Sequence, residues 1–234
     1  MINIVWGFNG TVVPMLPYTV FYDSDHILLD YLIQNRFFSF GDKLRASMLL
    51  RLEEKDFWAP CFRKHTGRFL EKKPSAVIEA VAKIISPRIP EENLDMMRGL
   101  RDAGYRMYIA SCSVGNIASR ALEMRNALDI FETVCANRIS VENGMMTEYN
   151  PVFIRGKDKI EYLEKNLKLS RENTVVIGSG RDDIPLLDWS GYPVFIDQSK
   201  RGWEKYRNKN YVFIESYRMI PSIIRSLTSK EHLN

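Results

Sequence analysis

The sequence predicts an α/β fold: a Rossmann-type parallel sheet core flanked by helices, with an inserted helical domain. Two observations predict it. Short apolar runs alternate with helix-like patterns through the second half of the chain, which is typical of strand–helix–strand units. The first half instead contains one block, residues 18–87, with helix-like stretches and no strong strand pattern. We therefore expect a core domain at residues 1–17 and 88–234, interrupted by a helical domain at 18–87.

The expected strands are short and apolar. They cover residues 2–6, 105–110, 175–177, 194–196 and 211–214. The first of them runs directly into a glycine-rich turn. The dipeptide Asn143-Gly144 predicts a β-hairpin, because this pair favours the tight two-residue turn between antiparallel strands.

The expected helices follow from apolar residues spaced three or four positions apart. Those in the inserted block cover residues 25–37, 42–54 and 75–85. The next begins at Pro90, since proline and acidic residues suit a first turn, and ends at Gly104. Another is expected around 117–128, and Lys159 stands near the start of one that runs to about residue 167.

Composition and charge exclude several classes of protein. Of 234 residues, 45% are apolar and 26% charged, which is typical of a globular protein and excludes a disordered chain. No apolar run approaches the ~20 residues of a membrane-spanning helix. The net charge of +4 comes from scattered basic residues, so neither a membrane nor a nucleic acid is expected as a partner. The N-terminus lacks a signal-peptide pattern, which favours a cytoplasmic location.

Metal and disulfide chemistry receive no support from the cysteines and histidines. The three cysteines are too few and too far apart for a disulfide framework or a paired zinc site. The three histidines are equally dispersed. Cys112, at the end of an expected strand, is either a nucleophile or a small buried residue, and burial is the more common role.

Polar and glycine-rich segments follow three of the expected strands. They are residues 7–11, 111–113 and 178–183. Ligands of open α/β sheets bind at the carboxyl ends of the strands, so these segments and Lys159 are expected to meet in one site.

In this order, the segments resemble the motifs of the haloacid dehalogenase (HAD) superfamily, specifically its phosphoserine-phosphatase-like branch. That branch begins with Asp-x-Asp-Gly-Thr-Val, which aligns with Gly-Phe-Asn-Gly-Thr-Val at residues 7–12. Its strand-ending Ser or Thr aligns with Ser111, and its helix-opening lysine with Lys159. Its motif Gly-Asp-Ser-x-x-Asp-x-Pro-x-Leu aligns with residues 178–187. The resemblance covers nearly the whole chain and implies that block 18–87 is a cap domain.

The same alignment implies that the family's catalytic groups are replaced here. The family's nucleophilic aspartate, also a Mg²⁺ ligand, is Gly7, which has no side chain. Its general acid/base is Asn9, which cannot exchange a proton in the working pH range. Asn9 and Ser179 also stand at Mg²⁺-binding positions of the family, while Asp183 is retained. The alignment thus predicts no catalytic residue and no metal site, and we expect no cofactor.

Groups that can hold a phosphate are retained. Ser111, the backbone N–H groups of Asn9, Gly10 and Thr11, and the charge of Lys159 are the expected phosphate ligands. We therefore expect a non-catalytic binder of a phosphorylated small molecule or a phosphorylated partner. One alternative is an active phosphomonoesterase with rerouted chemistry, for example through Asp182 or Asp183, which would need Mg²⁺. The other is an interaction scaffold without affinity for phosphate.

Three other segments have more than one interpretation. Asp23-Ser24-Asp25 is either a displaced aspartate pair or, more simply, a helix N-cap in the loop leading into the cap domain. Arg181 is either a second anion contact or a surface residue. The expected cap block, residues 18–87, also contains a group of aromatic residues that belong either to the cap core or to a lid or partner surface. They are Phe37, Phe38, Phe40, Phe57 and Trp58.

Overall fold

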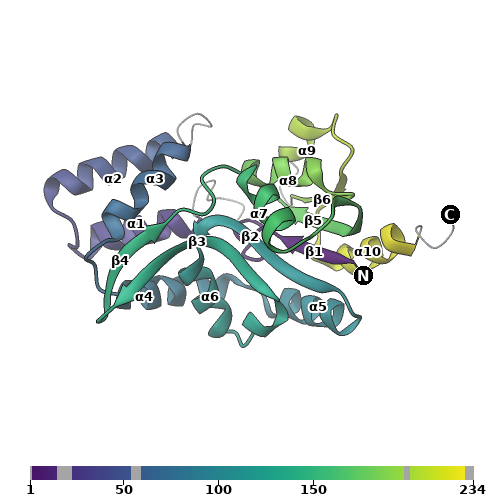
Figure 1. The fold of residues 1–234 in the computed structure, drawn as a ribbon, viewed down its shortest axis with the longest axis horizontal. Helices are drawn as coiled ribbons and strands as arrows, with labels where there is room; N and C mark the ends of the chain where they lie inside the picture. Colours follow the sequence, from purple (N-terminus) through teal and green to yellow (C-terminus); the bar gives the residue numbers. More distant parts are fainter. Residues whose placement is uncertain (1, 15–22, 54–58, 198–200, 230–234) are drawn as a thin grey trace.

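The computed structural model describes residues 2–14, 23–53, 59–197 and 201–229. Its centre is a seven-stranded sheet in the order β4-β3-β2-β1-β5-β6-β7 (Figure 1). The strands are β1 (Asn3–Trp6), β2 (Arg106–Val114), β3 (Thr133–Glu142), β4 (Met145–Asn150), β5 (Thr174–Gly178), β6 (Tyr192–Ile196) and β7 (Val212–Ile214). Neighbouring strands run parallel except β3 and β4. The predicted α/β fold with a mostly parallel sheet is confirmed.

Helices cover both faces of this sheet (Figure 1). One face carries α4 (Ala76–Ile85), α5 (Glu91–Asp102), α6 (Gly115–Glu123) and α10 (Ile220–Ser229). The other carries α7 (Asp158–Asn166), α8 (Ile184–Trp189) and α9 (Arg201–Tyr206). Because successive strand residues point to opposite faces, Ile4 and Trp6 join the first core and Val5 the second. Burial on both faces explains why the central strands are mostly apolar.

The first three helices form a cluster at one end of the sheet (Figure 1). They are α1 (Ser24–Gln34), α2 (Phe40–Glu53) and α3 (Ala59–Leu70). The fourth helix of the expected cap block, α4, packs both against α1 and against α6 of the core. The expected boundary at residues 17 and 18 lies outside the described residues, so the division into core and cap stays a prediction.

The β3–β4 hairpin turns at the predicted dipeptide. Asn143 and Gly144 both have positive φ angles, 50° and 75°, as a two-residue hairpin turn requires. Strand β2, in contrast, is longer than its sequence pattern indicates. Its pairing with β3 continues from Ser111 to Val114 through an irregular register, so Ser111 and Ser113 lie within the strand's last residues rather than after it.

The aromatic residues of the cap block divide between interior and surface. Phe38 is buried in the core, whereas the side chain of Phe40 is 87% exposed. Phe57 and Trp58 lie outside the described residues.

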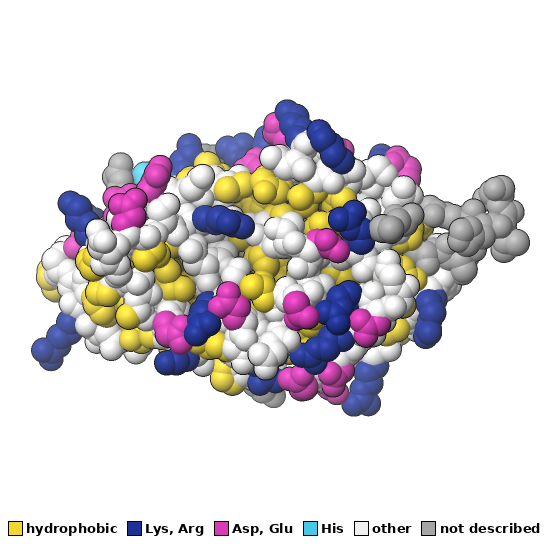
Figure 2. Space-filling view, turned by 60° about the horizontal axis from the view of Figure 1, so that its bottom comes forward, with side chains coloured by type: hydrophobic (Ala, Val, Ile, Leu, Met, Phe, Trp, Pro, Cys, Tyr) yellow, Lys and Arg dark blue, Asp and Glu magenta, His cyan; other side chains and the backbone are white. Residues whose placement is uncertain are grey.

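The surface shows no single-sign charged stripe on the face drawn in Figure 2, where basic and acidic side chains alternate. Within the described part of the chain, no helix has the length and apolar character needed to cross a bilayer.

Candidate functional site

The carboxyl ends of β1, β2 and β5 bring the motif residues together. Thr11 Oγ1 donates a hydrogen bond to Ser179 Oγ at 3.3 Å, which joins the loop after β1 to the turn after β5. Asn9 Nδ2 donates to Ser113 Oγ at 2.7 Å and so joins the same loop to β2. Ser111, also at the end of β2, is buried, and its hydroxyl oxygen accepts a hydrogen bond from the amide of Ser113. Parallel neighbours end at the same edge of a sheet, which is why segments far apart in the sequence meet here.

The carboxylate of Asp183 lies at the centre of these contacts. Its Oδ1 accepts a hydrogen bond from Lys159 Nζ at 2.8 Å. Its Oδ2 accepts from the amides of Ser179 and Gly180, at 3.1 and 3.3 Å. Both oxygens are therefore engaged within the chain, and η4 (Arg181–Asp183) is held in place by its own last residue.

Lys159 does not offer a free positive charge, contrary to what the sequence suggests. Its side chain is 2% exposed and forms an ion pair with Asp183. Burial alone would lower the pKa of this amine, but the neighbouring Asp183 carboxylate outweighs that effect and raises it. The lysine therefore stays protonated with its charge neutralised internally.

Gly7 is closely packed against the same carboxylate. A Cβ atom added to Gly7 would lie 2.9 Å from Asp183 Oδ2 and 3.0 Å from Thr11 Oγ1. The space in which a side chain at this position would begin is thus already filled. An aspartate there would require Asp183 to move, and it would place two carboxylates in contact.

The side chain of Asn9 is fixed by two elements. In addition to Ser113, its Nδ2 donates to Ser24 Oγ at 3.2 Å, and its Oδ1 accepts from the amide of Ser24 at 3.3 Å. Ser24 begins α1, so Asn9 links the loop after β1 to the first cap helix. Sequence analysis did not single out Ser24 for this contact.

Only part of the expected backbone cradle is available to a ligand. The amide of Gly10 donates to Val13 O at 2.7 Å, and that of Thr11 donates to Phe8 O at 3.3 Å. Both N–H groups are therefore engaged in hydrogen bonds within the loop. The backbone N–H of Asn9 has no hydrogen-bond partner among the described residues.

The Asp23-Ser24-Asp25 segment forms a helix N-cap. Asp23 Oδ1 accepts from the amides of Asp25 and His26, at 3.0 and 2.9 Å. Asp25 is buried, and its Oδ1 accepts from the amide of Val114 at 3.2 Å. Burial, together with the neighbouring Asp23 carboxylate, raises the pKa of Asp25 to about 7. The segment thus anchors α1 to the end of β2.

A buried arginine that sequence analysis missed joins the cap helices to the site. Arg63 of α3 donates to Ile154 O at 2.8 Å and forms an ion pair with Asp182. These partners are 91 and 119 residues away along the chain, so no local pattern could have indicated the contact. Arg181 lies on the same turn as Asp182. Its role, as a second anion contact or as a surface residue, stays a prediction.

Cys112 has the environment of a structural cysteine. It is buried, and burial raises the pKa of its thiol to about 11, which keeps it in the unreactive protonated form at neutral pH.

Comparison with known protein families identifies the family of this chain. A sequence model described as haloacid dehalogenase-like hydrolase matches residues 4–188. The chain belongs to this HAD family. A search of curated protein sequences gave no significant match.

Solved structures resemble this HAD protein over almost its whole length. A substrate-bound phosphoserine phosphatase complex has a TM-score of 0.64 and 17% identity, covering 94% of this chain and 97% of its own. A phosphoserine phosphohydrolase-like protein from Francisella tularensis subsp. tularensis SCHU S4 has a TM-score of 0.68 and 14% identity, covering 96% and 100%. Cytosolic 5′-nucleotidase IIIB bound to cytidine has a TM-score of 0.70 and 15% identity, covering 98% and 86%. At these identities the likeness establishes the fold.

The side chains of this HAD protein do not fit the Mg²⁺ ion typical of the family. Mg²⁺ prefers a nearly octahedral set of oxygen ligands, usually with one or two carboxylates. Gly7 offers no side chain, Ser179 offers a neutral hydroxyl, and both oxygens of Asp183 are engaged by Lys159 and backbone amides. Within the described ranges, no three His, Cys, Asp or Glu residues are grouped as a metal site would need.

Proposed function

We propose that this HAD-family protein binds a phosphate monoester, on a small molecule or a partner protein, and does not hydrolyse it through an aspartyl-phosphate. The observation that carries the proposal is the packing of Asp183 against Gly7. A nucleophile is absent at that position, and the remaining carboxylate fills the space it would occupy.

The chemistry of the surrounding groups supports binding without turnover. Asn9 donates hydrogen bonds to its two serine partners, but its carboxamide is not acidic enough to protonate a leaving alkoxide. Asp183 is neutralised by Lys159, which makes it a poor nucleophile and a poor base. Loss of a catalytic nucleophile alone typically lowers turnover by several orders of magnitude.

Groups suited to a phosphate remain at the same edge of the sheet. They are the hydroxyl of Ser111 and the backbone N–H of Asn9, both of which can donate to a phosphate oxygen, whereas the charge of Lys159 is balanced by Asp183. The ligand class also agrees with the structural neighbours, whose names, phosphoserine phosphatase and 5′-nucleotidase, denote phosphate esters.

The experiment is a titration of the purified protein with phosphoserine and with inorganic phosphate, followed by calorimetry. Ser111→Ala should weaken binding about tenfold, because it removes a hydrogen bond to a charged group. Ser140→Ala, on the exposed part of β3, is the matched control and should bind like the wild type.

Turnover of an aryl phosphate, measured with and without Mg²⁺, completes the test. We expect none above the rate of the Ser111→Ala variant. Mg²⁺-dependent turnover that disappears in Ser111→Ala would instead identify an active phosphomonoesterase. If neither phosphate compound binds and no turnover is seen, the proposal fails in favour of an interaction scaffold.

A further inference from the structure

The outer side of α2 carries a row of exposed apolar side chains. Phe40, Leu44 and Met48 are 87%, 67% and 57% exposed. Residues four positions apart on an α-helix lie on the same face, so the three side chains form one stripe about 12 Å long. Figure 1 shows α2 at the end of the molecule opposite α10. Single exposed apolar residues are ordinary on protein surfaces, whereas a contiguous group of them marks an interaction surface.

The inner side of the same helix is also apolar. Ala46 and Leu49 are buried in the core, and Leu50 packs against it. This side of α2 contacts α1 and α3. A surface helix normally has one apolar face, toward the core, and polar residues on the opposite face. Because α2 has two apolar faces and the fold covers one of them, packing within the chain does not account for the exposed stripe.

The stripe has the shape of a ridge. Side chains four residues apart form the rows that pack into the grooves of another helix. Gly41 and Ser47 stand beside this row, one on each side, and both are small and exposed. A Cβ atom added to Gly41 would have no neighbouring atom within 4 Å. A ridge with open grooves on both sides suits a second helix, whereas a bilayer surface takes up a broad apolar face.

Positive charge borders the stripe. Lys43 and Arg45 lie on its two sides, and neither forms an ion pair with another residue in the described part of the chain. The nearest carboxylate along the helix, that of Asp42, instead accepts a hydrogen bond from Ser39 Oγ at 2.7 Å, at the start of α2. The basic side chains beside the stripe are therefore available to carboxylates of a partner.

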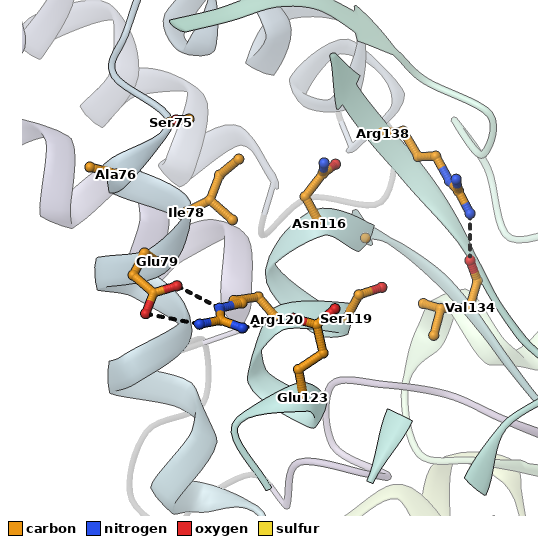
Figure 3. Close-up of a pocket in the computed structure, with 11 residues that line it drawn as sticks. Ser75, Ala76, Ile78, Glu79, Asn116, Ser119, Arg120, Glu123, Val134 and Arg138 are labelled. Carbon is orange, nitrogen blue, oxygen red and sulfur yellow. Dashed lines mark hydrogen bonds and ion pairs between the residues drawn. The ribbon is translucent and has the colours of Figure 1, made fainter. Parts of the chain in front are cut away.

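A cavity of about 560 Å³ between α4, α6 and β3 differs from this surface (Figure 3). Its carboxylates belong to Glu79 and Glu123, and Arg120 donates to them at 2.5 and 2.8 Å. Lys83 lies a further 3.7 Å from Glu79. The carboxylates of this cavity are thus already neutralised within the chain, in contrast to the basic side chains beside the stripe.

We propose that the outer face of α2 binds an amphipathic helix of a partner protein, with acidic residues on both sides of its apolar row. The apolar side chains of the partner pack into the grooves beside Phe40, Leu44 and Met48. Its carboxylates pair with Lys43 and Arg45. A stripe of about 12 Å corresponds to a little over two turns of the partner helix. This surface is independent of the proposed phosphate site.

A second copy of this chain is less complementary to the stripe. In a twofold antiparallel pairing of two α2 helices centred on Leu44, each side of one helix faces the same side of the other. Lys43 then lies beside Lys43 of the other copy, and Arg45 beside Arg45. Like charges in these positions oppose the pairing, so the charge pattern favours an acidic partner.

The test uses a fluorescently labelled peptide, Glu-Leu-Ala-Ala-Leu-Glu-Ala-Glu-Leu-Ala-Ala-Leu-Glu-Ala-Glu. As a helix, this peptide has one row of leucines with glutamates on both sides. Its binding to the full-length protein is followed by fluorescence anisotropy, beside a basic peptide in which every Glu is Lys. We expect saturable binding of the acidic peptide below millimolar concentration, and binding of the basic peptide at least about tenfold weaker.

Variants of α2 identify the surface that binds. Leu44→Ser should weaken binding of the acidic peptide about tenfold, because it removes the central apolar contact. The double variant Lys43→Glu/Arg45→Glu should reverse the preference, so that the basic peptide binds about tenfold more tightly than the acidic one. Ile84→Ser is the matched control, since Ile84 is 40% exposed on α4 and lies outside the stripe. It should bind the acidic peptide like the wild type, and circular dichroism checks that each variant is folded.

Equal binding of the two peptides would overturn the proposal, and so would an unchanged affinity in Leu44→Ser. Absence of binding of the acidic peptide at millimolar concentration would also overturn it. Sedimentation velocity, and flotation with vesicles of phosphatidylcholine and phosphatidylserine, separate the other occupants. If the wild type dimerises or binds the vesicles, Leu44→Ser does neither, and the acidic peptide does not bind, then a second copy or a membrane covers α2 and the proposal fails.

Discussion

Replacement of Lys159 by methionine tests how the centre of the site is held together. Lys159 is 2% exposed and Asp183 9% exposed, and their charged atoms are 2.8 Å apart. Lys159→Met keeps the length of the side chain but leaves the buried carboxylate without its counter-charge. Removing one partner of a buried ion pair typically costs about 3–5 kcal/mol in the free energy of unfolding.

The assay is urea unfolding followed by circular dichroism, for Lys159→Met, Asp183→Asn and the double variant. The double variant should recover much of the loss, since no uncompensated charge is left buried. Lys165→Met, on the same helix, is the matched control, because its ion pair with Glu161 is solvent-exposed and its loss should change stability little.

The pH range of this stabilisation follows from the raised pKa of Lys159. A lysine whose pKa is higher in the folded state than the ordinary value of 10.5 stabilises the fold below that pH and loses the contribution as the pH rises through the folded value. The loss in the free energy of unfolding caused by Lys159→Met should therefore be constant between pH 6 and 9. A coupling energy below about 0.5 kcal/mol in the double-mutant cycle would refute the buried pair.

Three further outcomes follow from the site. Gly7→Asp should lower stability by about 1–3 kcal/mol in urea unfolding, because its side chain overlaps Asp183. Asp25 keeps its proton up to about pH 7 in the folded state but releases it near pH 3.8 when unfolded, so stability contributed by this group falls as the pH rises through that window. The free energy of unfolding of Asp25→Asn, relative to that of the wild type, should therefore increase between pH 4 and 7 by on the order of a few kcal/mol. Unfolding measured across that pH range tests this. Cys112 should resist alkylation by iodoacetamide at pH 8 in the native protein and react after denaturation, as peptide mass spectrometry can show.

Local sequence features determined the secondary-structure elements and the residue types at the motif positions. The apolar runs and the Asn143-Gly144 turn predicted strands and a hairpin that the structure confirms, because strand burial and turn geometry depend on neighbouring residues. The resemblance aligns Gly7, Asn9 and Ser179 with the family's catalytic and Mg²⁺-binding positions, and the absent or neutral character of these side chains is likewise visible in the sequence alone.

The tertiary structure decided how the remaining groups are used. Asp183 turns toward Lys159, 24 residues away, and fills the space beside Gly7. Arg63 reaches Asp182 across 119 residues, and Asn9 reaches Ser113 across 104. Sequence patterns report on residues that are close along the chain, whereas these contacts depend on which strand ends lie side by side in the sheet. Which charges are neutralised inside the site, and which remain available to a ligand, is therefore settled only once the chain is folded.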